Sequence, residues 1–241
     1  MQSGTYIALS GQLALQRRLE TIANNIANAS TPGFRAEQVT FETVLSHAPL
    51  EPVAFSSVGK TYISRNPGEI TRTENPLDVA VDGDAWLAIQ TPAGQAYTRD
   101  GRMRLTEAGE LQTLAGHPVL DVGGAPLLLD PDAGPPEISR DGTITQNNRQ
   151  VGALGLFRIS ADSNLTRYGN AGVIPDRPAE PILDFVQVGV MQGYVERANV
   201  TPVHEMSRLI TISRSFEAIT GVLNEAESSL REAIRNISGN P

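Results

Sequence analysis

The two ends of this 241-residue chain share one hydrophobic periodicity, and the middle follows another. Apolar residues near each end recur at alternating steps of three and four, which places them along one side of a helix. We call these two series the helix seams; they comprise Leu15, Leu19, Ile22, Ile26 and Ala29, and then Leu209, Ile212, Phe216, Ile219, Leu223, Ala226, Leu230, Ala233 and Ile237. A narrow apolar seam needs a partner helix. We therefore expect the ends to meet each other, to meet the ends of neighbouring molecules, or to dock on a common core.

Turn and capping residues place the helix ends. A first helix is predicted over about residues 4–29, and it stops at Ser30-Thr31-Pro32-Gly33 because Pro32 lacks an amide donor and Gly33 permits a turn. The last helix is predicted from Pro202 to Ser238, after Thr201 as N-cap. At 1.5 Å per residue it would be about 50 Å long. A small β domain cannot cover that length, so most of its seam must be buried elsewhere.

Between the helices the apolar period changes to two. Residues 77–81 alternate, and the pair Asp82-Gly83 before residues 86–89 is typical of a hairpin. Similar short units follow turns at residues 92–94 and 108–109 and recur up to about residue 159. The fold class is therefore α+β, mainly β: an antiparallel all-β central domain with long terminal α-helices that form a coiled-coil-like pair. The predicted organisation is an N-terminal helix (1–33) that joins the C-terminal helix (202–241) in an inner helical domain, an extended linker with a strand or two (34–75), the β domain (76–185) and a return strand (186–201).

Composition excludes several classes of function. A formal charge of -8 with scattered Lys and Arg argues against a nucleic-acid surface. The absence of cysteine excludes a disulfide framework, a thiolate metal site and a cysteine nucleophile. No uncharged apolar run is long enough to insert into a membrane, and the first fifteen residues lack the basic region of a Sec signal. If the protein leaves the cytoplasm, we expect it to do so without a cleaved Sec signal.

Candidate catalytic and metal sites are weak. Gly59-Lys60-Thr61 lacks both the leading glycine and the context of a phosphate-binding loop. Asp78, Asp82 and Asp84 are interpreted as solvent-side residues of a strand and a turn, and the three histidines His47, His117 and His204 share no ligand spacing. We predict no enzyme activity, no cofactor and no metal.

Several ordered motifs carry a family resemblance. The run from Asn24 to Arg35 resembles the N-terminal signature of bacterial flagellar rod and hook proteins. The match continues through Asn75-Pro76-Leu77-Asp78-Val79-Ala80-Val81, Tyr97-Thr98-Arg99-Asp100-Gly101, Gln192-Gly193-Tyr194-Val195-Glu196 with Asn199-Val200, and Arg214-Ser215-Phe216-Glu217. The chain is most similar to the proximal-rod branch of the family, and the distal-rod branch is the alternative. Ala198, Pro202 and His204 depart from the family pattern at the junction with the last helix.

The resemblance implies a structural role in the flagellar basal body. Rod proteins polymerise in the periplasm into a tubular drive shaft that transmits torque and encloses the export channel, with their terminal helices inside and their β domains outside. The implied partners are copies of the chain, other rod proteins including the distal-rod protein, and the flagellar type III export apparatus. The predicted assembly interface comprises Leu15, Leu19, Ile22, Asn24, Asn25, Ile26, Asn28, Leu209, Ile212, Phe216, Ile219, Leu223, Leu230 and Ile237.

Some alternatives stay open. Asparagine is a poor helix former, so Asn24, Asn25 and Asn28 indicate either amide contacts across subunits or solvated capping near the turn. A secreted adhesin with a coiled-coil stalk and a β-rich head would share the periodicities but not the ordered motifs. A hydrolase is a more distant possibility.

Overall fold

The chain forms two compact units joined at four points along the sequence. The computed structural model describes residues 2–41, 43–45, 54–57, 59–237 and 239. The helical unit comprises Met1–Ala27, Glu37–Tyr62 and Thr201–Pro241, and the β unit comprises Asn28–Ala36 and Ile63–Val200. Terminal helices and antiparallel strands between them confirm the α+β, mainly β class. His47 lies outside the described residues.

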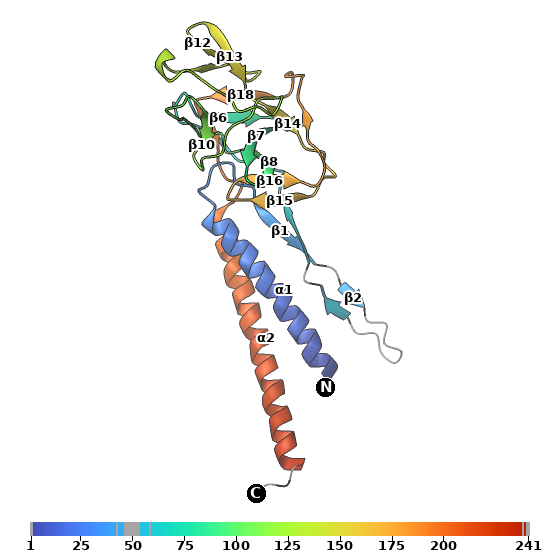
Figure 1. The fold of residues 1–241 in the computed structure, drawn as a ribbon. Coiled ribbons are helices and arrows are strands. Elements are labelled where there is room, and N and C mark those ends of the chain that lie inside the picture. The colour runs from blue at the N-terminus through green and yellow to red at the C-terminus, as the bar shows by residue number, and fades with distance from the viewer. Residues whose placement is uncertain (1, 42, 46–53, 58, 238, 240–241) are drawn as a thin grey trace. The chain divides into compact units, whose positions relative to one another are not determined.

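Two antiparallel helices dominate the helical unit. Helix α1 (Gln2–Ala27) and helix α2 (Pro202–Ile237) lie side by side, with the N- and C-termini at the same end of the pair (Figure 1). Their register is marked by Gly11, where an added Cβ would lie 3.6 Å from Ile219 Cδ1, and by Gln12 Nε2, which donates to Thr220 Oγ1 at 3.2 Å. The two ends of the sequence therefore meet each other within one chain.

The region predicted as an extended linker contains more strands than the one or two expected. Strand β1 (Glu37–Thr40) pairs with β4 (Lys60–Ile63), and β2 (Thr43–Leu45) pairs with β3 (Ala54–Ser56). Strand β5 (Ile70–Arg72) pairs with β19 (Tyr194–Glu196), near the end of the β unit. These strands are only three or four residues long, which is too short for a clear alternation, and β5 also finds its partner more than one hundred residues later in the sequence.

A six-stranded antiparallel sheet organises the β unit, in the order β15-β16-β8-β7-β14-β17. Smaller sheets hold β18 with β6, β9 with β10, and β11-β12-β13. The strands not yet located are β6 (Val79–Asp82), β7 (Trp86–Thr91), β8 (Gly94–Thr98), β9 (Met103–Leu105), β10 (Leu111–Thr113), β11 (Glu137–Ile138), β12 (Thr143–Gln146), β13 (Arg149–Ala153), β14 (Leu156–Arg158), β15 (Leu165–Tyr168), β16 (Gly172–Pro175), β17 (Glu180–Pro181) and β18 (Gly189–Gln192), with a short 3-10 helix, η1 (Pro131–Ala133).

Strand β7 is central because both of its faces are buried. Leu87 and Ile89 belong to one apolar cluster, and Trp86 and Ala88 belong to a second cluster on the other face of the sheet. This explains why Trp86-Leu87-Ala88-Ile89 is a continuous apolar run instead of an alternating one. The β unit thus has a core on each side of its main sheet.

The hairpin predicted at Asp82-Gly83 is wrong. Strand β6, which ends at Asp82, pairs with β18, whereas β7 pairs with β8 and β14. The turn therefore connects two sheets, because β6 finds a partner more than one hundred residues later in the sequence. The predicted turns at residues 92–94 and 108–109 do close antiparallel pairs, β7 with β8 and β9 with β10.

Candidate assembly interface

The predicted interface residues mark the side of each helix that is removed from solvent. Ile22 of α1 and Ile212 of α2 are buried, and the flanking seam positions are half-buried. The half-buried positions are Leu15, Leu19, Asn24, Ile26, Asn28, Leu209, Phe216, Ile219 and Leu223. Leu230 and Ile237 lie in α2, but their side chains are outside what the structure describes. The seams thus coincide with the α1–α2 contact, and their role between subunits stays a prediction.

Asn25 stabilises the chain where it leaves α1. Its side chain is 3% exposed, its Nδ2 donates to the Glu37 carbonyl at 2.8 Å, and its Oδ1 accepts from the Glu37 N–H at 2.9 Å. Both ends of the amide are therefore bonded to the backbone at the start of β1, within the helical unit. Asn28, in the turn that follows, accepts from Thr31 through its carbonyl, at 2.9 Å, and through its Oδ1, at 3.3 Å.

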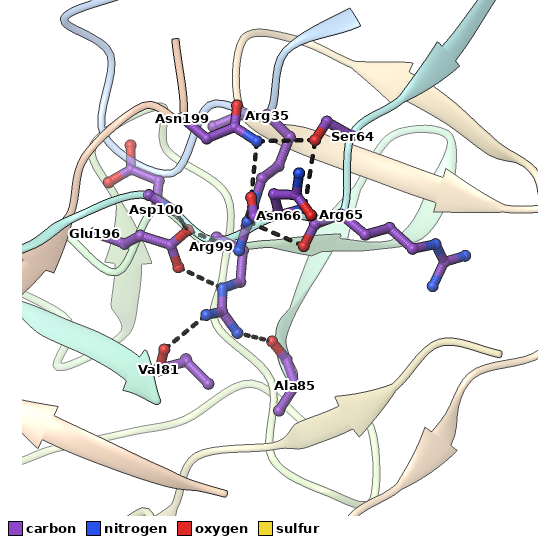
Figure 2. A network of polar contacts seen from close by, with 12 residues as sticks. Arg35, Ser64, Arg65, Asn66, Val81, Ala85, Arg99, Asp100, Glu196 and Asn199 are labelled. Carbon is purple, nitrogen blue, oxygen red and sulfur yellow. Dashed lines mark hydrogen bonds and ion pairs between the residues drawn. The ribbon is translucent and has the colours of Figure 1, made fainter. Parts of the chain in front are cut away.

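A buried ionic cluster in the β unit joins three distant parts of the chain (Figure 2). Glu196, at the end of β19, is 1% exposed and lies 2.6 Å from Arg35 Nη2 through Oε1 and 2.6 Å from Arg99 Nε through Oε2. The Gly68 N–H also donates to Oε1, at 2.9 Å. We call Arg35, Arg99 and Glu196 the arginine cluster. A buried carboxylate is stable here because two guanidinium groups and an amide satisfy its oxygens.

The two arginines are held by backbone carbonyls as well as by charge. Arg99 donates through Nη2 to Val81 O at 2.7 Å and through Nη1 to Gly83 O at 2.9 Å and to Ala85 O. Burial lowers the pKa of Arg35 to about 10, and the nearby Glu196 carboxylate opposes that shift. Arg35 therefore stays protonated at neutral pH, and the cluster carries one more positive than negative charge. The guanidinium carbons of Arg35 and Arg99 lie 5.6 and 6.0 Å from the ring centroid of Trp86.

Backbone hydrogen bonds hold the segment that follows α1 beside the segment that precedes α2. The Gly33 N–H donates to Glu196 O at 2.8 Å, and the Asn199 N–H donates to Phe34 O at 3.2 Å. The Asn199 side chain accepts from the Ala36 N–H at 2.6 Å and donates to Ser64 Oγ at 3.1 Å. The chain therefore leaves the β unit toward both helices from two segments that are bonded together.

Sequence reasoning missed this cluster although its members lie in the motifs that carry the resemblance. Arg35 ends the first motif, Arg99 is the middle residue of the third, and Glu196 ends the run 192–196 of the fourth. The available signal was the presence of charged residues among the apolar and turn residues of those motifs. These three residues are more than sixty positions apart in the sequence, so no local periodicity links them. Only the fold brings their side chains together.

Gly33 offers a stability test of this junction. Its φ is +69°, and an added Cβ would lie 2.1 Å from the Asp100 N. We expect Gly33→Ala to destabilise the β unit by at least about 2 kcal/mol more than Gly124→Ala. Gly124 has a similar φ of +83° but nothing within 4 Å, so it isolates the backbone cost. Urea unfolding followed by the fluorescence of Trp86, the chain's one tryptophan, measures both variants. Equal losses would contradict the close approach.

The other candidate residues that the structure describes lie apart from one another. Within the part of the chain that the structure describes, no group of three or more His, Asp or Glu side chains is placed to hold a metal ion. Asp78 is buried and accepts from Asn75 Nδ2 at 3.0 Å, so its interpretation as a solvent-side residue is wrong; Asp82 and Asp84 are exposed. His117 packs edge-on against Tyr168, and His204 is exposed in the first turn of α2.

Comparisons with known proteins match the two ends and the middle of the chain. Residues 6–35 match the family model described as flagella basal body rod protein, residues 80–146 match the flagellar hook protein FlgE/F/G D1 domain, and residues 191–236 match the flagellar basal body rod FlgEFG protein C-terminal model. The first and last of these regions include most of α1 and α2.

Comparison with full-length relatives shows which branch of the flagellar rod proteins is most similar to the chain. The chain is 50% identical over 237 residues to the flagellar basal-body rod protein FlgF of Mesorhizobium japonicum, covering 98% of both chains. It is 46% identical over 239 residues to FlgF of Rhizobium meliloti, covering 99% of both. It is 29% identical over 267 residues to the flagellar basal-body rod protein FlgG of Bacillus subtilis, covering 97% of this chain and 98% of that one. The chain therefore belongs to the flagellar basal-body rod protein FlgF family, whose members are structural proteins of the rod and not enzymes.

Proposed function

We propose that the chain is a proximal-rod subunit that polymerises through its terminal helices into the periplasmic drive shaft, which transmits torque and encloses the export channel. The FlgF relatives support the proximal position, since they are 50% and 46% identical to the chain and the FlgG relative is 29% identical. The distal rod is therefore the less favoured alternative. A stalked adhesin has no support from the family matches.

The antiparallel helix pair carries this proposal. Gly11 lies beside Ile219, so the first residue of α1, Gln2, lies beside about residue 228 of α2. Helix α2 continues to Ile237, which leaves its last turns, about 14 Å of helix, without α1 beside them. The apolar seam of the sequence continues through those turns, at Leu230 and Ile237. A helix that extends past its partner with a continuing seam is suited to packing on a neighbouring subunit.

The proposed partners follow from that role. They are copies of the chain, other flagellar rod proteins including the distal-rod protein, and the flagellar type III export apparatus that would deliver the subunit to the periplasm. Neither described helix is both long enough and apolar enough to cross a lipid bilayer. Coiled-coil packing of the seams is part of the proposal, because the 3-4 spacing is the one that such packing requires.

Deletion of the gene tests the proposal. We expect deletion cells to keep the membrane ring of the basal body but to lack rod and hook, because later subunits would have no rod to extend. Electron microscopy of isolated basal bodies measures this, and a plasmid copy of the gene should restore hooks and swimming. Complete rods and hooks in deletion cells would contradict the proposed function. Loss of surface attachment with normal swimming would instead favour an adhesin.

A further inference from the structure

A segment near the end of the chain completes the β unit. Among the residues that the structure describes, β6 has β18 as its only strand partner, and β5 has only β19. Both of these partners lie within residues 188–199, which we call the closing segment. The other described strand pairs of the β unit all form within residues 86–181. Two strands from the first third of the chain therefore wait for partners from its last quarter.

The closing segment also completes one of the two apolar cores. Val188 and Val190 are 2% and 3% exposed and belong to the same cluster as Leu87 of β7. Val79 and Val81 of β6, which are fully buried, belong to that cluster too. A chain without the closing segment would leave the backbone groups of β6 unpaired along one edge and would expose part of this core to water.

Polar side chains of the closing segment bind parts of the β unit that are far apart in the sequence. Gln192 Nε2 donates to Pro76 O at 2.8 Å and to Pro136 O at 2.7 Å. Its Oε1 accepts from the Ile138 N–H at 3.1 Å. Glu196 supplies the one carboxylate of the arginine cluster. Without it, two buried guanidinium groups would lack a counter-charge, which is strongly destabilising.

These losses would all occur together in a chain that lacks the closing segment. The stability of a domain is a small difference between large opposing terms. A β unit that lost two strand partners, part of its core and the counter-charge of two buried arginines would therefore not stay folded. A chain is synthesised from its N-terminus, so the closing segment is made late, and only α2 and the last residues follow it.

We propose that the β unit cannot fold during synthesis until the closing segment has been made and has joined it. The same step bonds residues 33–36 to residues 196–199, so the segments that lead to α1 and α2 come together when the β unit closes. A chain that ends before the closing segment would have an unfolded β unit and unjoined helix leads, which would keep it out of the rod. That consequence for assembly rests on the proposed function, whereas the order of folding does not.

A force measurement on growing chains tests this order. Chains are translated with a force-sensitive arrest sequence fused after successive positions, up to the full 241 residues, and folding is measured as release from the arrest. In the first variant series, a Gly/Ser linker of about twenty residues is inserted between Leu183 and Asp184. Both residues are exposed and lie in the loop before the closing segment, where an insertion is tolerated. The control series carries the same linker between Val200 and Thr201, directly after the closing segment.

Two checks accompany the variants. A further series places the linker between Val186 and Gln187, which are also exposed, so that the result does not depend on one insertion site. Urea unfolding of each full-length variant, followed by Trp86 fluorescence, shows whether its completed β unit is folded.

We expect a linker before the closing segment to delay the onset of release by its own length, about twenty codons, because the closing segment then emerges that much later. The linker after Val200 should leave the onset unchanged. An onset that the earlier linkers do not move would overturn the proposal, because the β unit would fold without the closing segment. An onset that every linker moves would also overturn it, since α2 would then be the limiting element.

Release at no chain length would contradict the proposal as well, because the closing segment would have emerged without completing the β unit. None of these outcomes bears on the deletion test. Cells that lack rods after deletion would keep the proposed function even if the β unit folded before its closing segment was made.

Discussion

Replacing Glu196 by glutamine is expected to lower the stability of the β unit by about 3–5 kcal/mol, because it leaves two buried guanidinium groups without their counter-charge. The three side chains of the arginine cluster are at most 3% exposed, so water cannot replace the lost carboxylate. The melting temperature should fall by about 10 °C. Trp86 fluorescence reports the transition of the β unit, since both arginines lie near its ring.

Glu74→Gln is the matched control for this prediction. Glu74 forms an ion pair with Arg72 at 3.6 Å in the same unit, but the two side chains are 74% and 67% exposed. An exposed pair contributes little, so we expect a change within about 0.5 kcal/mol. If the two glutamine variants melted together, the arginine cluster would not be a main source of stability in the β unit.

The same cluster has a consequence for assembly. Arg35 follows α1 in the sequence and Glu196 precedes α2, so their ion pair holds the two segments that lead to the helices. A Glu196→Gln subunit should therefore lose the ion pair between these segments and keep only their backbone and Asn199 hydrogen bonds. Motility of cells that carry the variant should fall even at temperatures where its helices still form.

The helices were predictable from the sequence because their information is local. Seam spacing, Pro32 with Gly33 and the Thr201-Pro202 cap placed all four ends of α1 and α2 within two residues of where they lie. That the seams would meet within one chain was only one of three open possibilities. Periodicity states that a face is buried, but it does not identify the partner.

The β unit was predictable in class but not in pairing. Alternation and turn residues indicated antiparallel strands, and local hairpins such as β7 with β8 follow from them. The pairs β6 with β18 and β5 with β19 join residues more than one hundred positions apart, which no local pattern encodes. The arginine cluster depends on those same long-range pairs, since β19 carries Glu196.

Asp78 shows how a local pattern misleads. Its position in an alternating run indicated the solvent side, but it is buried beside Asn75, with which it hydrogen-bonds. A carboxylate at such a position is stable when a nearby amide satisfies it. Whether such a polar residue is buried therefore depends on its hydrogen-bond partner. Here the partner, Asn75, lies outside the alternating run from which the strand was predicted.

Replacing Phe216 by aspartate is expected to disrupt the helix pair and to abolish swimming. Phe216 is half-buried on the seam side of α2, so the substitution removes apolar contact and places a carboxylate there without a partner. We expect a loss of about 2–4 kcal/mol in the helical unit. Far-ultraviolet circular dichroism should show earlier melting of the helices, while Trp86 fluorescence should report an unchanged β unit, because Phe216 belongs to the helical unit.

Ala218→Asp separates the seam from the helix itself. Ala218 is exposed on the side of α2 away from the seam, so the same charge there should cost only the difference in helix propensity, below about 1 kcal/mol. Cells with Ala218→Asp should swim, and cells with Phe216→Asp should not. Normal swimming of the Phe216→Asp strain would remove this residue from the interface on which assembly depends. If the β unit of the Phe216→Asp variant unfolded together with its helices, α2 would be stabilised by the β core. The seam would then be needed first for the fold of the single subunit and only second for rod assembly.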